Sequence, residues 1–246
     1  MELSLLRALV EMKEIMKEWH LFLNEQVQDK KKIYVLVGPP AVGKSTWIRQ
    51  NAPEAYVVSS DEITVEVARE RGMTYDDMFD YPPQPTNRDG SPNLSFDPSY
   101  VHPRWGPIVD QQLSWKKWAP KAYKKVNDAE VEAQKRIEQR YANATSAGSD
   151  IVLDLTNMNK GSRKFAIQKL GDISNFDLVA INFGWNDDVD FLKKNSAERS
   201  QREFEETGMK KTIPPAAFDR MIGGYESPSE DEGFIDVQNA KAWWAK

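Results

Sequence analysis

A glycine-containing segment with the composition of a phosphate-binding loop follows the apolar run Ile33–Val37. It reads Gly38-Pro39-Pro40-Ala41-Val42-Gly43-Lys44-Ser45-Thr46 and satisfies the pattern G-x-x-x-x-G-K-[ST]. Backbone N–H groups of such a loop, and of the helix after it, converge on phosphate oxygens, and glycine allows their close approach. Lys44 is expected on the β- and γ-phosphates, and the Ser45 hydroxyl on Mg²⁺. The pattern therefore predicts that a nucleoside triphosphate is bound by Gly38, Ala41, Val42, Gly43, Lys44, Ser45 and Thr46.

Two acidic residues stand at the carboxyl ends of predicted strands, where open α/β sheets build their binding sites. Asp61 follows the apolar run Ala55–Ser59, and Asp154 closes the run that begins at Ile151. A carboxylate at Asp61 can accept the proton of an attacking hydroxyl and hold it in line with the γ-phosphorus, so we predict that it is the general base. It would also serve as an N-cap for a helix starting at Glu62. Asp154 is predicted to support Mg²⁺, directly or through water, and solvent-exposed strand termination is the alternative.

A charged helix predicted over residues 187–206 supplies several cations. They are Lys193, Lys194, Arg199 and Arg202, with Lys210 and Lys211 following near Gly208. Cations on a mobile helix can close over a triphosphate and stabilise charge on the transferred group. Most charge runs are only solvated faces, and glutamates share this helix. We predict that Arg199 or Arg202 is catalytic, and the sequence does not choose between them.

The positions of these residues require an alternation of strands and helices. Short β-branched runs at 33–37, 55–59, 151–155 and 178–183 alternate with helical segments, which predicts an α/β fold with a parallel β-sheet flanked by helices. A short helix opened by a proline is expected over 214–222. A polar tail is expected over 223–246, with Trp243 and Trp244 docking back onto the fold.

Residues 2–28 carry apolar side chains at alternating four- and three-residue steps, at Leu5, Leu9, Met12, Met16, Trp19 and Leu23. This spacing is typical of an amphipathic helix with one buried stripe, which we expect to dock on the main domain. We predict that the chain has three parts. They are an N-terminal amphipathic helix (1–30), a phosphate-loop (P-loop) domain (31–228) with a substrate-recognition insertion at 73–145, and a C-terminal tail (229–246).

The insertion between the second and third strands is rich in proline and aromatic residues. Seven of the 14 prolines fall between Pro82 and Pro107, which predicts a long loop that serves as a lid, a binding loop or a disordered insert. A largely helical stretch interrupted at Pro120 is expected from about 105 to 144. Within it, residues 114–125 contain five lysines, three aromatic residues and no acid. Lysines neutralise phosphates and aromatic rings stack on unpaired bases, whereas an amphipathic helix that packs Trp115 and Trp118 inward is an equal alternative.

The composition excludes several other kinds of site. The 246 residues contain no cysteine and two histidines, so disulfides, thiolate zinc sites, cysteine nucleophiles and histidine-based triads lack their residues. The net charge of −5 argues against binding nucleic acid through bulk electrostatics and leaves room for a local basic patch. No apolar stretch approaches the roughly 20 residues of a membrane span, and the acidic N-terminus differs from a signal peptide. We expect a cytoplasmic protein, in the host cytoplasm if it is viral, with no membrane or partner-protein association evident.

In their order, these residues resemble the phage-type polynucleotide 5′-kinases and related small P-loop kinases, including phage kinases that act on hydroxymethylated DNA bases. Four segments carry the likeness over most of residues 31–228. They are Gly38–Trp47, Ser60-Asp61-Glu62, Asp154–Asn159 with Arg163 following, and Lys194–Ser196 through Ile213–Pro215. The resemblance implies that Asp61 is the general base, that Lys44 and Ser45 hold the triphosphate and Mg²⁺, and that the helix Lys193–Arg202 is the lid.

The chain departs from this family at three points. The family often carries an arginine a few residues after the catalytic Asp, where this chain has Thr64, so its acceptor contacts would be rebuilt. Leu155 separates Asp154 from the Thr156-Asn157 pair, which the acid abuts in some members. Nothing resembles the phosphatase domain that accompanies some of these kinases, so end-healing would stop at phosphorylation.

Together these features predict a P-loop kinase that transfers the γ-phosphate of ATP, with Mg²⁺, to a hydroxyl on nucleic acid, DNA more than RNA. The acceptor is either a polynucleotide 5′-hydroxyl or a 5-hydroxymethyl pyrimidine in phage DNA, and its predicted contacts are Trp105, Trp115, Lys116, Trp118 and Arg163. The alternatives are a small-molecule or nucleoside kinase and a nucleotide-gated interaction protein. A kinase is favoured over a switch because Asp61 lies where a hydroxyl must be deprotonated.

Overall fold

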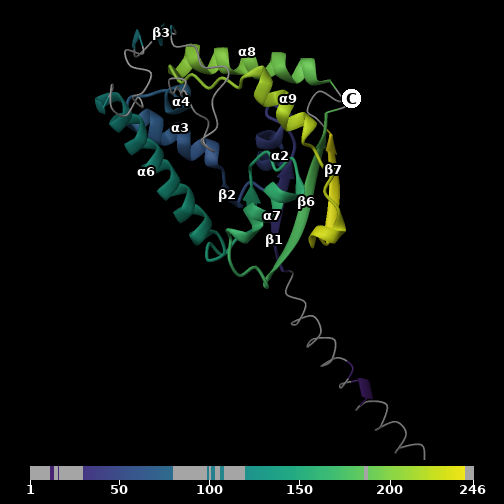
Figure 1. Cartoon of the computed structure of the whole chain (residues 1–246). Helices are drawn as coiled ribbons and strands as arrows, with labels where there is room; N and C mark the ends of the chain where they lie inside the picture. The colour runs from purple at the N-terminus through teal and green to yellow at the C-terminus, as the bar shows by residue number, and fades with distance from the viewer. Residues whose placement is uncertain are drawn as a thin grey trace, which may run out of the picture.

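The computed structural model describes residues 12–13, 16, 30–79, 99, 101–102, 106–107, 120–185 and 188–241. Within them a five-stranded sheet has the order β2-β5-β1-β6-β7, and every neighbouring pair is parallel. The strands are β1 (Lys31–Val37), β2 (Tyr56–Val58), β5 (Ile151–Leu153), β6 (Phe176–Gly184) and β7 (Asp236–Lys241). The predicted α/β fold with a parallel sheet is therefore confirmed (Figure 1).

Helices connect the parallel strands, as a parallel sheet requires. They are α2 (Lys44–Asn51), α3 (Ser60–Glu70), α4 (Tyr75–Phe79), α6 (Pro120–Ala144), α7 (Lys160–Gln168), α8 (Val189–Thr207) and α9 (Pro215–Gly223). A one-turn 3₁₀ helix, η1 (Glu230–Glu232), precedes β7. In Figure 1, α8 lies across the end of the molecule at which β1 and β6 finish, and α3 and α6 form an outer layer beside the sheet. The charged helix and the proline-opened helix were both predicted, and both are present.

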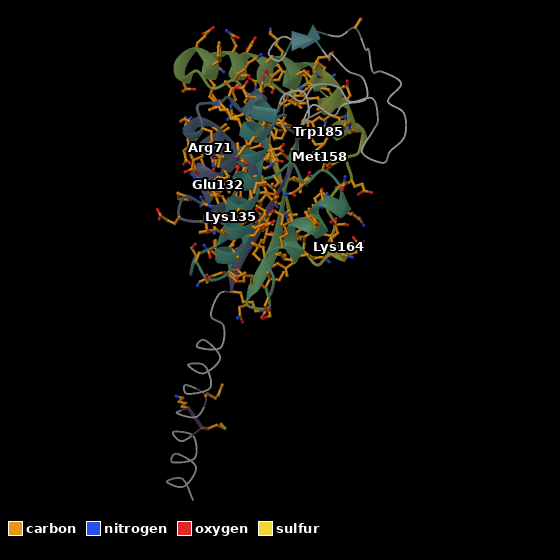
Figure 2. The ribbon with its side chains drawn as sticks, turned by 60° about the vertical axis from the view of Figure 1, so that its left-hand side comes forward. Arg71, Glu132, Lys135, Met158, Lys164 and Trp185 are labelled. Carbon is orange, nitrogen blue, oxygen red and sulfur yellow. The ribbon has the colours of Figure 1, made fainter. Side chains whose placement is uncertain are left out.

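Alternating side chains of β1 divide the core between the two faces of the sheet. Ile33, Val35 and Val37 pack in a cluster with residues of α6 and α7, whereas Leu36 packs in a second cluster with residues of α2 and α9. Met158 and Trp185, labelled in Figure 2, belong to the second cluster. Because both faces are covered by helices, the central strands are apolar on both sides, and this made them visible in the sequence.

A smaller third cluster fixes the outer layer of α3, α4 and α6. Val67 and Ala68 of α3 pack against Val126 and Ala129 of α6, and Met78 of α4 completes the contact. Arg71, Glu132 and Lys135 lie along this layer in Figure 2, on its solvent side. The cluster holds α3, which follows β2, at a fixed place beside the carboxyl edge of the sheet.

The structure corrects the prediction for the C-terminal segment. Residues 223–246 were expected to be a polar tail, but η1 and β7 lie within it, and β7 pairs with β6 from Val179↔Asp236 to Gly184↔Lys241. An edge strand needs main-chain pairing on one side only and tolerates polar side chains, so β7 lacks the β-branched run that identifies a central strand. Trp243 and Trp244 lie outside the described residues.

The structure also bears on the predictions for the insertion and for the N-terminal helix. Within the insertion, the described part of α6 runs from Pro120 to Ala144, and Gly106–Pro107 forms strand β4 opposite β3 (Val101–His102). Residues 108–119, on which the predicted interruption at Pro120 depends, lie outside the described residues. Of the predicted N-terminal helix, the structure describes Met12, Lys13 and Met16, which are helical. Met12 and Met16 are more than half exposed, so they do not form part of a buried stripe, and the remainder of that prediction lies outside the described residues. In the part of the chain that is described, no helix is long and apolar enough to cross a membrane.

Candidate active site

The predicted P-loop connects β1 to α2 and wraps around the first turn of that helix. Gly43, the residue before α2, has φ 113°, a left-handed conformation that favours glycine, and Ala41 has φ 65°. A Cβ on Gly38 would lie 3.0 Å from Phe183 Cβ and 3.1 Å from Val42 Cγ1, so only glycine fits there without displacing the strand. Since Gly43 has no side chain to cap α2, the N–H groups of the first turn are left to bind an anion, as the pattern predicts.

Lys44 extends from the first turn of α2 back across the loop. Its Nζ donates hydrogen bonds to the carbonyl oxygens of Gly38, at 3.0 Å, and Pro39, at 3.1 Å. Burial lowers the pKa of Lys44, and the negative charges of Asp154 and Asp61 oppose that shift. The ammonium group therefore lies between the loop and two carboxylates, at the position where phosphate oxygens would be held.

Asp61 lies in the first turn of α3, directly after β2. The N-cap of α3 is Ser59, whose hydroxyl accepts from the Glu62 N–H at 3.4 Å, so Asp61 is not the N-cap that the sequence also allowed. The hydroxyl of Tyr75 donates to Asp61 Oδ1 at 3.1 Å, and Lys211 Nζ donates to Oδ2 at 2.8 Å. The carboxylate side chain is still 58 % exposed, because it opens into a cavity.

The charges around Asp61 keep it ionised. Burial alone would raise its pKa, but the charge and hydrogen bond of Lys211, the hydroxyl of Tyr75 and the charge of Lys44 outweigh this, and the pKa lies below its ordinary value. In turn, burial and the neighbouring Asp61 carboxylate raise the pKa of the Tyr75 hydroxyl, which therefore stays protonated as a donor. An ionised carboxylate with fixed donors has the state that a general base requires.

Asp154 and Ser45 are the two residues that the sequence predicts as Mg²⁺ ligands. Asp154 follows β5, and its N–H donates to the Val58 carbonyl of β2 at 3.0 Å, which brings the ends of both strands to one edge. Burial raises the pKa of Asp154, Lys44 opposes this, and Asp61 adds to it. The described residues contain no group of three or more acidic or histidine side chains arranged as a metal site. This fits Mg²⁺, which takes one or two protein oxygens and completes its shell with phosphate oxygens and water.

These residues surround one cavity of about 860 Å³. The P-loop, α3 and α8 provide its walls, and Lys44, Ser45, Asp61, Asp154, Arg199, Arg202 and Lys211 all line it. Of the two predicted lid arginines, Arg199 is close enough for its charge to act on both Lys44 and Asp154. Asn195 of α8 donates a long hydrogen bond, 3.4 Å, to the Ala41 carbonyl, so α8 touches the loop directly.

Other cations of α8 are engaged elsewhere. Lys193 pairs with Asp219 of α9, and Lys194 lies 3.9 Å from Glu198 on the exposed side of α8. Within the predicted lid segment Lys193–Arg202, the residues that line the cavity are Asn195, Ser196, Arg199, Ser200 and Arg202.

The structure contradicts the predicted substrate role of Arg163. Its side chain is completely buried, and its guanidinium donates to both carboxylate oxygens of Glu232, at 2.8 and 2.7 Å, and to the carbonyls of Asn157 and Glu226. Arg163 therefore joins α7 to the segment before β7. The other predicted acceptor contacts, Trp105, Trp115, Lys116 and Trp118, lie outside the described residues.

Thr64, at the position where the sequence departs from the phage-type kinases that it resembles, does not line the cavity. It is buried, and its hydroxyl donates to the Ser60 carbonyl at 2.8 Å. Tyr75 and Asn195 were not predicted as site residues, because neither side chain carries a charge, although Asn195 lies in the segment Lys194–Ser196 that contributes to the family resemblance. The sequence offered Lys210 and Lys211 equally as cations near the triphosphate, and the structure shows that Lys211 lines the cavity and Lys210 does not.

Lys44→Ala should weaken ATP binding and phosphoryl transfer together, each by on the order of 10²-fold, since it removes a cation from the phosphate site. Calorimetric titration with ATP and a turnover assay would measure the two effects. Lys164→Ala is the control, because Lys164 is exposed on the outer side of α7 (Figure 2). Unchanged turnover in Lys44→Ala would contradict the role of the loop.

Comparison with known proteins identifies a family but no close relative. A family model described as "AAA domain" matches residues 33–228. No curated protein matches the sequence.

Several solved structures match the chain as a whole at low similarity. A presumed kinase from Chloroflexus aurantiacus j-10-fl has 13 % identity and a TM-score of 0.40, with 88 % of each chain covered. A gluconokinase from Sinorhizobium meliloti 1021 has 12 % identity and a TM-score of 0.37, with 88 % of this chain and 85 % of the other covered. A structure of the PezAT chromosomal toxin-antitoxin system of Streptococcus pneumoniae has 12 % identity and a TM-score of 0.35, with 90 % of each covered. At these values the likeness bears on neither substrate nor mechanism.

Proposed function

The chain belongs to the AAA-domain family of P-loop kinases, and from that premise we propose that it transfers the γ-phosphate of ATP to a hydroxyl group of a nucleic acid. The family uses ATP and Mg²⁺, as the sequence predicted. We further propose membership of the phage-type polynucleotide kinases, with a 5′-hydroxyl or a hydroxymethylated pyrimidine of DNA as the acceptor.

The observation that carries this proposal is that Asp61 and Lys44 line the same cavity. The charge of each acts on the pKa of the other, so the carboxylate lies near the phosphate position and not on a remote surface. A nucleotide-gated binding protein that acts on no acceptor hydroxyl does not require an ionised carboxylate at this position. A kinase needs one, because the acceptor hydroxyl must lose its proton as it attacks phosphorus.

The remaining cavity residues have complementary roles in this proposal. The N–H groups of the loop and Lys44 hold the triphosphate, and Ser45 and Asp154 would hold Mg²⁺. Mg²⁺, when bound, supplies positive charge that offsets the charge of the phosphates. Arg199 of α8 faces the same space and stabilises charge on the transferred group, while Arg202 lies one turn further along the helix.

The shape of the cavity supports an acceptor that extends beyond its reacting hydroxyl. Asp61, Glu62, Val65, Glu66 and Arg69 line it, and these positions form one stripe along α3. At 1.5 Å per residue, the stripe runs about 12 Å from the base to Arg69. A small alcohol would fill only the first part of this length, whereas a larger acceptor would occupy more of it and reach toward Arg69.

Labelled ATP offered to four acceptors tests the proposal. They are a 5′-hydroxyl oligonucleotide, duplex DNA with hydroxymethylated pyrimidines, RNA, and free nucleosides, with a 5′-phosphorylated oligonucleotide as the control. We expect label on one of the two DNA acceptors and a transfer rate that falls as salt rises, because nucleic acid binding is salt-dependent. Label found only on free nucleosides would overturn the acceptor class, and label released only as inorganic phosphate would overturn the kinase.

A further inference from the structure

The connection between α8 and α9, residues 208–214, is fixed against α4. Met209 is buried in the cluster of α3, α4 and α6, and its sulfur accepts the Tyr75 N–H at 3.1 Å. The Asp76 N–H donates to the Lys210 carbonyl at 3.1 Å, and the Thr212 N–H donates to Asp76 Oδ1 at 2.6 Å. Contacts on both sides of Lys211 therefore hold this stretch of backbone in place.

The two adjacent lysines of this connection point in different directions. Lys211 Nζ lies 2.8 Å from Asp61 Oδ2 and 4.9 Å from the centre of the Tyr75 ring, and the side chain is 24 % exposed. Lys210 Nζ lies 3.8 Å from Asp76 Oδ2, and its side chain is 58 % exposed. Only Lys211 lines the cavity. Its position results from the docked backbone and not from a mobile surface chain.

We propose that Lys211 is a positioning residue that holds the Asp61 carboxylate for phosphoryl transfer. This inference rests on the proposed function. Tyr75 donates to Oδ1 and Lys211 to Oδ2, so the carboxylate cannot rotate freely, and each oxygen keeps a lone pair for the acceptor hydroxyl.

Charged groups from every side face Asp61. Lys44 of α2 and Lys211 are positive, and Asp154 after β5 and Glu62 of α3 are negative. Tyr75 of α4 contributes its hydroxyl. Lys211 is the largest of the groups that oppose the effect of burial on the pKa of Asp61. Its removal should therefore raise the pKa of Asp61, and less of the base would be ionised as pH falls.

Kinetic comparison of Lys211→Met with Lys210→Met tests the inference. We expect Lys211→Met to lower kcat by on the order of 10-fold or more, because a misplaced catalytic group is costly, while KM for ATP changes by no more than about twofold. The acid limb of its pH profile should move to higher pH. Lys211→Arg should recover most of kcat, and Lys210→Met should behave as the unaltered protein.

A second measurement does not depend on turnover. The Asp61 carboxyl carbon, followed by ¹³C NMR across pH, should titrate at higher pH in Lys211→Met and at the original pH in Lys210→Met. An unchanged titration, or equal kcat in Lys211→Met and the unaltered protein, would overturn the inference. If Lys211→Met fails to fold, Lys211→Gln replaces it, and failure of both assigns Lys211 a purely structural role and overturns the inference. If the unaltered protein transfers no phosphate, the proposed function falls, and the titration alone decides for or against Lys211.

Discussion

Asp61→Asn is expected to lower phosphoryl transfer by about 10²–10⁴-fold, the usual contribution of a general base, while ATP still binds. The amide has nearly the same size as the carboxylate, and its oxygen can still accept from Lys211 or Tyr75. It cannot take the proton of the acceptor hydroxyl. Transfer of labelled phosphate to the acceptor that the four-acceptor experiment identifies, together with calorimetric titration with ATP, measures both halves of this result.

The matched control for this variant is Asp128→Asn. Asp128 lies on the exposed side of α6 and pairs with Lys124, so the same chemical change there should leave transfer unaltered. Normal transfer in Asp61→Asn would remove the catalytic role of Asp61 and with it the main support for a kinase. Loss of ATP binding in the same variant would instead mean that Asp61 shapes the triphosphate site.

The state of Asp61 also determines how transfer should depend on pH. Its pKa lies below the ordinary aspartate value of about 3.9, so the base stays ionised throughout the neutral range. Protonation of Asp61 should therefore limit the rate only under acid conditions. This separates its effect from that of Asp154, whose pKa burial raises.

Features of the site that follow from a local motif or from the ends of predicted strands could be predicted from the sequence. The P-loop is a continuous segment in which two glycines are required by the backbone itself. Gly38 lies too close to its neighbours for a side chain, and Gly43 has a positive φ. Asp61 and Asp154 could be placed because residues at the carboxyl ends of parallel strands share one edge of the sheet. The central strands were visible because both of their faces are buried and therefore apolar.

Features that depend on contacts between distant segments could not be predicted. Lys210 and Lys211 are identical in type and adjacent, and only the docking of their backbone on α4 decides which one reaches Asp61. Strand β7 is polar and gains its structure from pairing with β6. Arg163 follows a motif that suggested substrate contact, but its partner Glu232 is 69 residues away in the sequence. In each case the chemical type of the residue was clear and its surroundings were not.

The burial of Arg163 leads to a large effect on stability. Arg163→Met should reduce the free energy of unfolding by about 3–5 kcal/mol, the usual cost of removing one partner of a buried ion pair. The Glu232 side chain, only 10 % exposed, would keep its charge without a partner, and the carbonyls of Asn157 and Glu226 would lose their donor. Chemical denaturation monitored by circular dichroism measures this loss.

Two further variants show whether the ion pair itself is responsible. Arg163→Met combined with Glu232→Leu should recover part of the stability, because it removes the isolated charge and fills the space with apolar atoms. Lys160→Met is the control, since Lys160 is also on α7 and pairs with the C-terminal segment, through Asp231, but in solvent. Equal losses in Arg163→Met and Lys160→Met would contradict the assignment of Arg163 as a buried clamp.

Loss of the Arg163–Glu232 ion pair should also weaken ATP binding, because Arg163 contacts the segment Thr156-Asn157, which is hydrogen-bonded to β1 and to the P-loop. Arg163 donates to the Asn157 carbonyl, the Asn157 amide donates to the Leu36 carbonyl of β1 at 3.0 Å, and the Thr156 carbonyl accepts the Gly38 N–H at 3.1 Å. Arg163→Met should therefore bind ATP more weakly than Lys160→Met under conditions where both are folded. If the two bind ATP equally well, Arg163 stabilises the fold without positioning the P-loop.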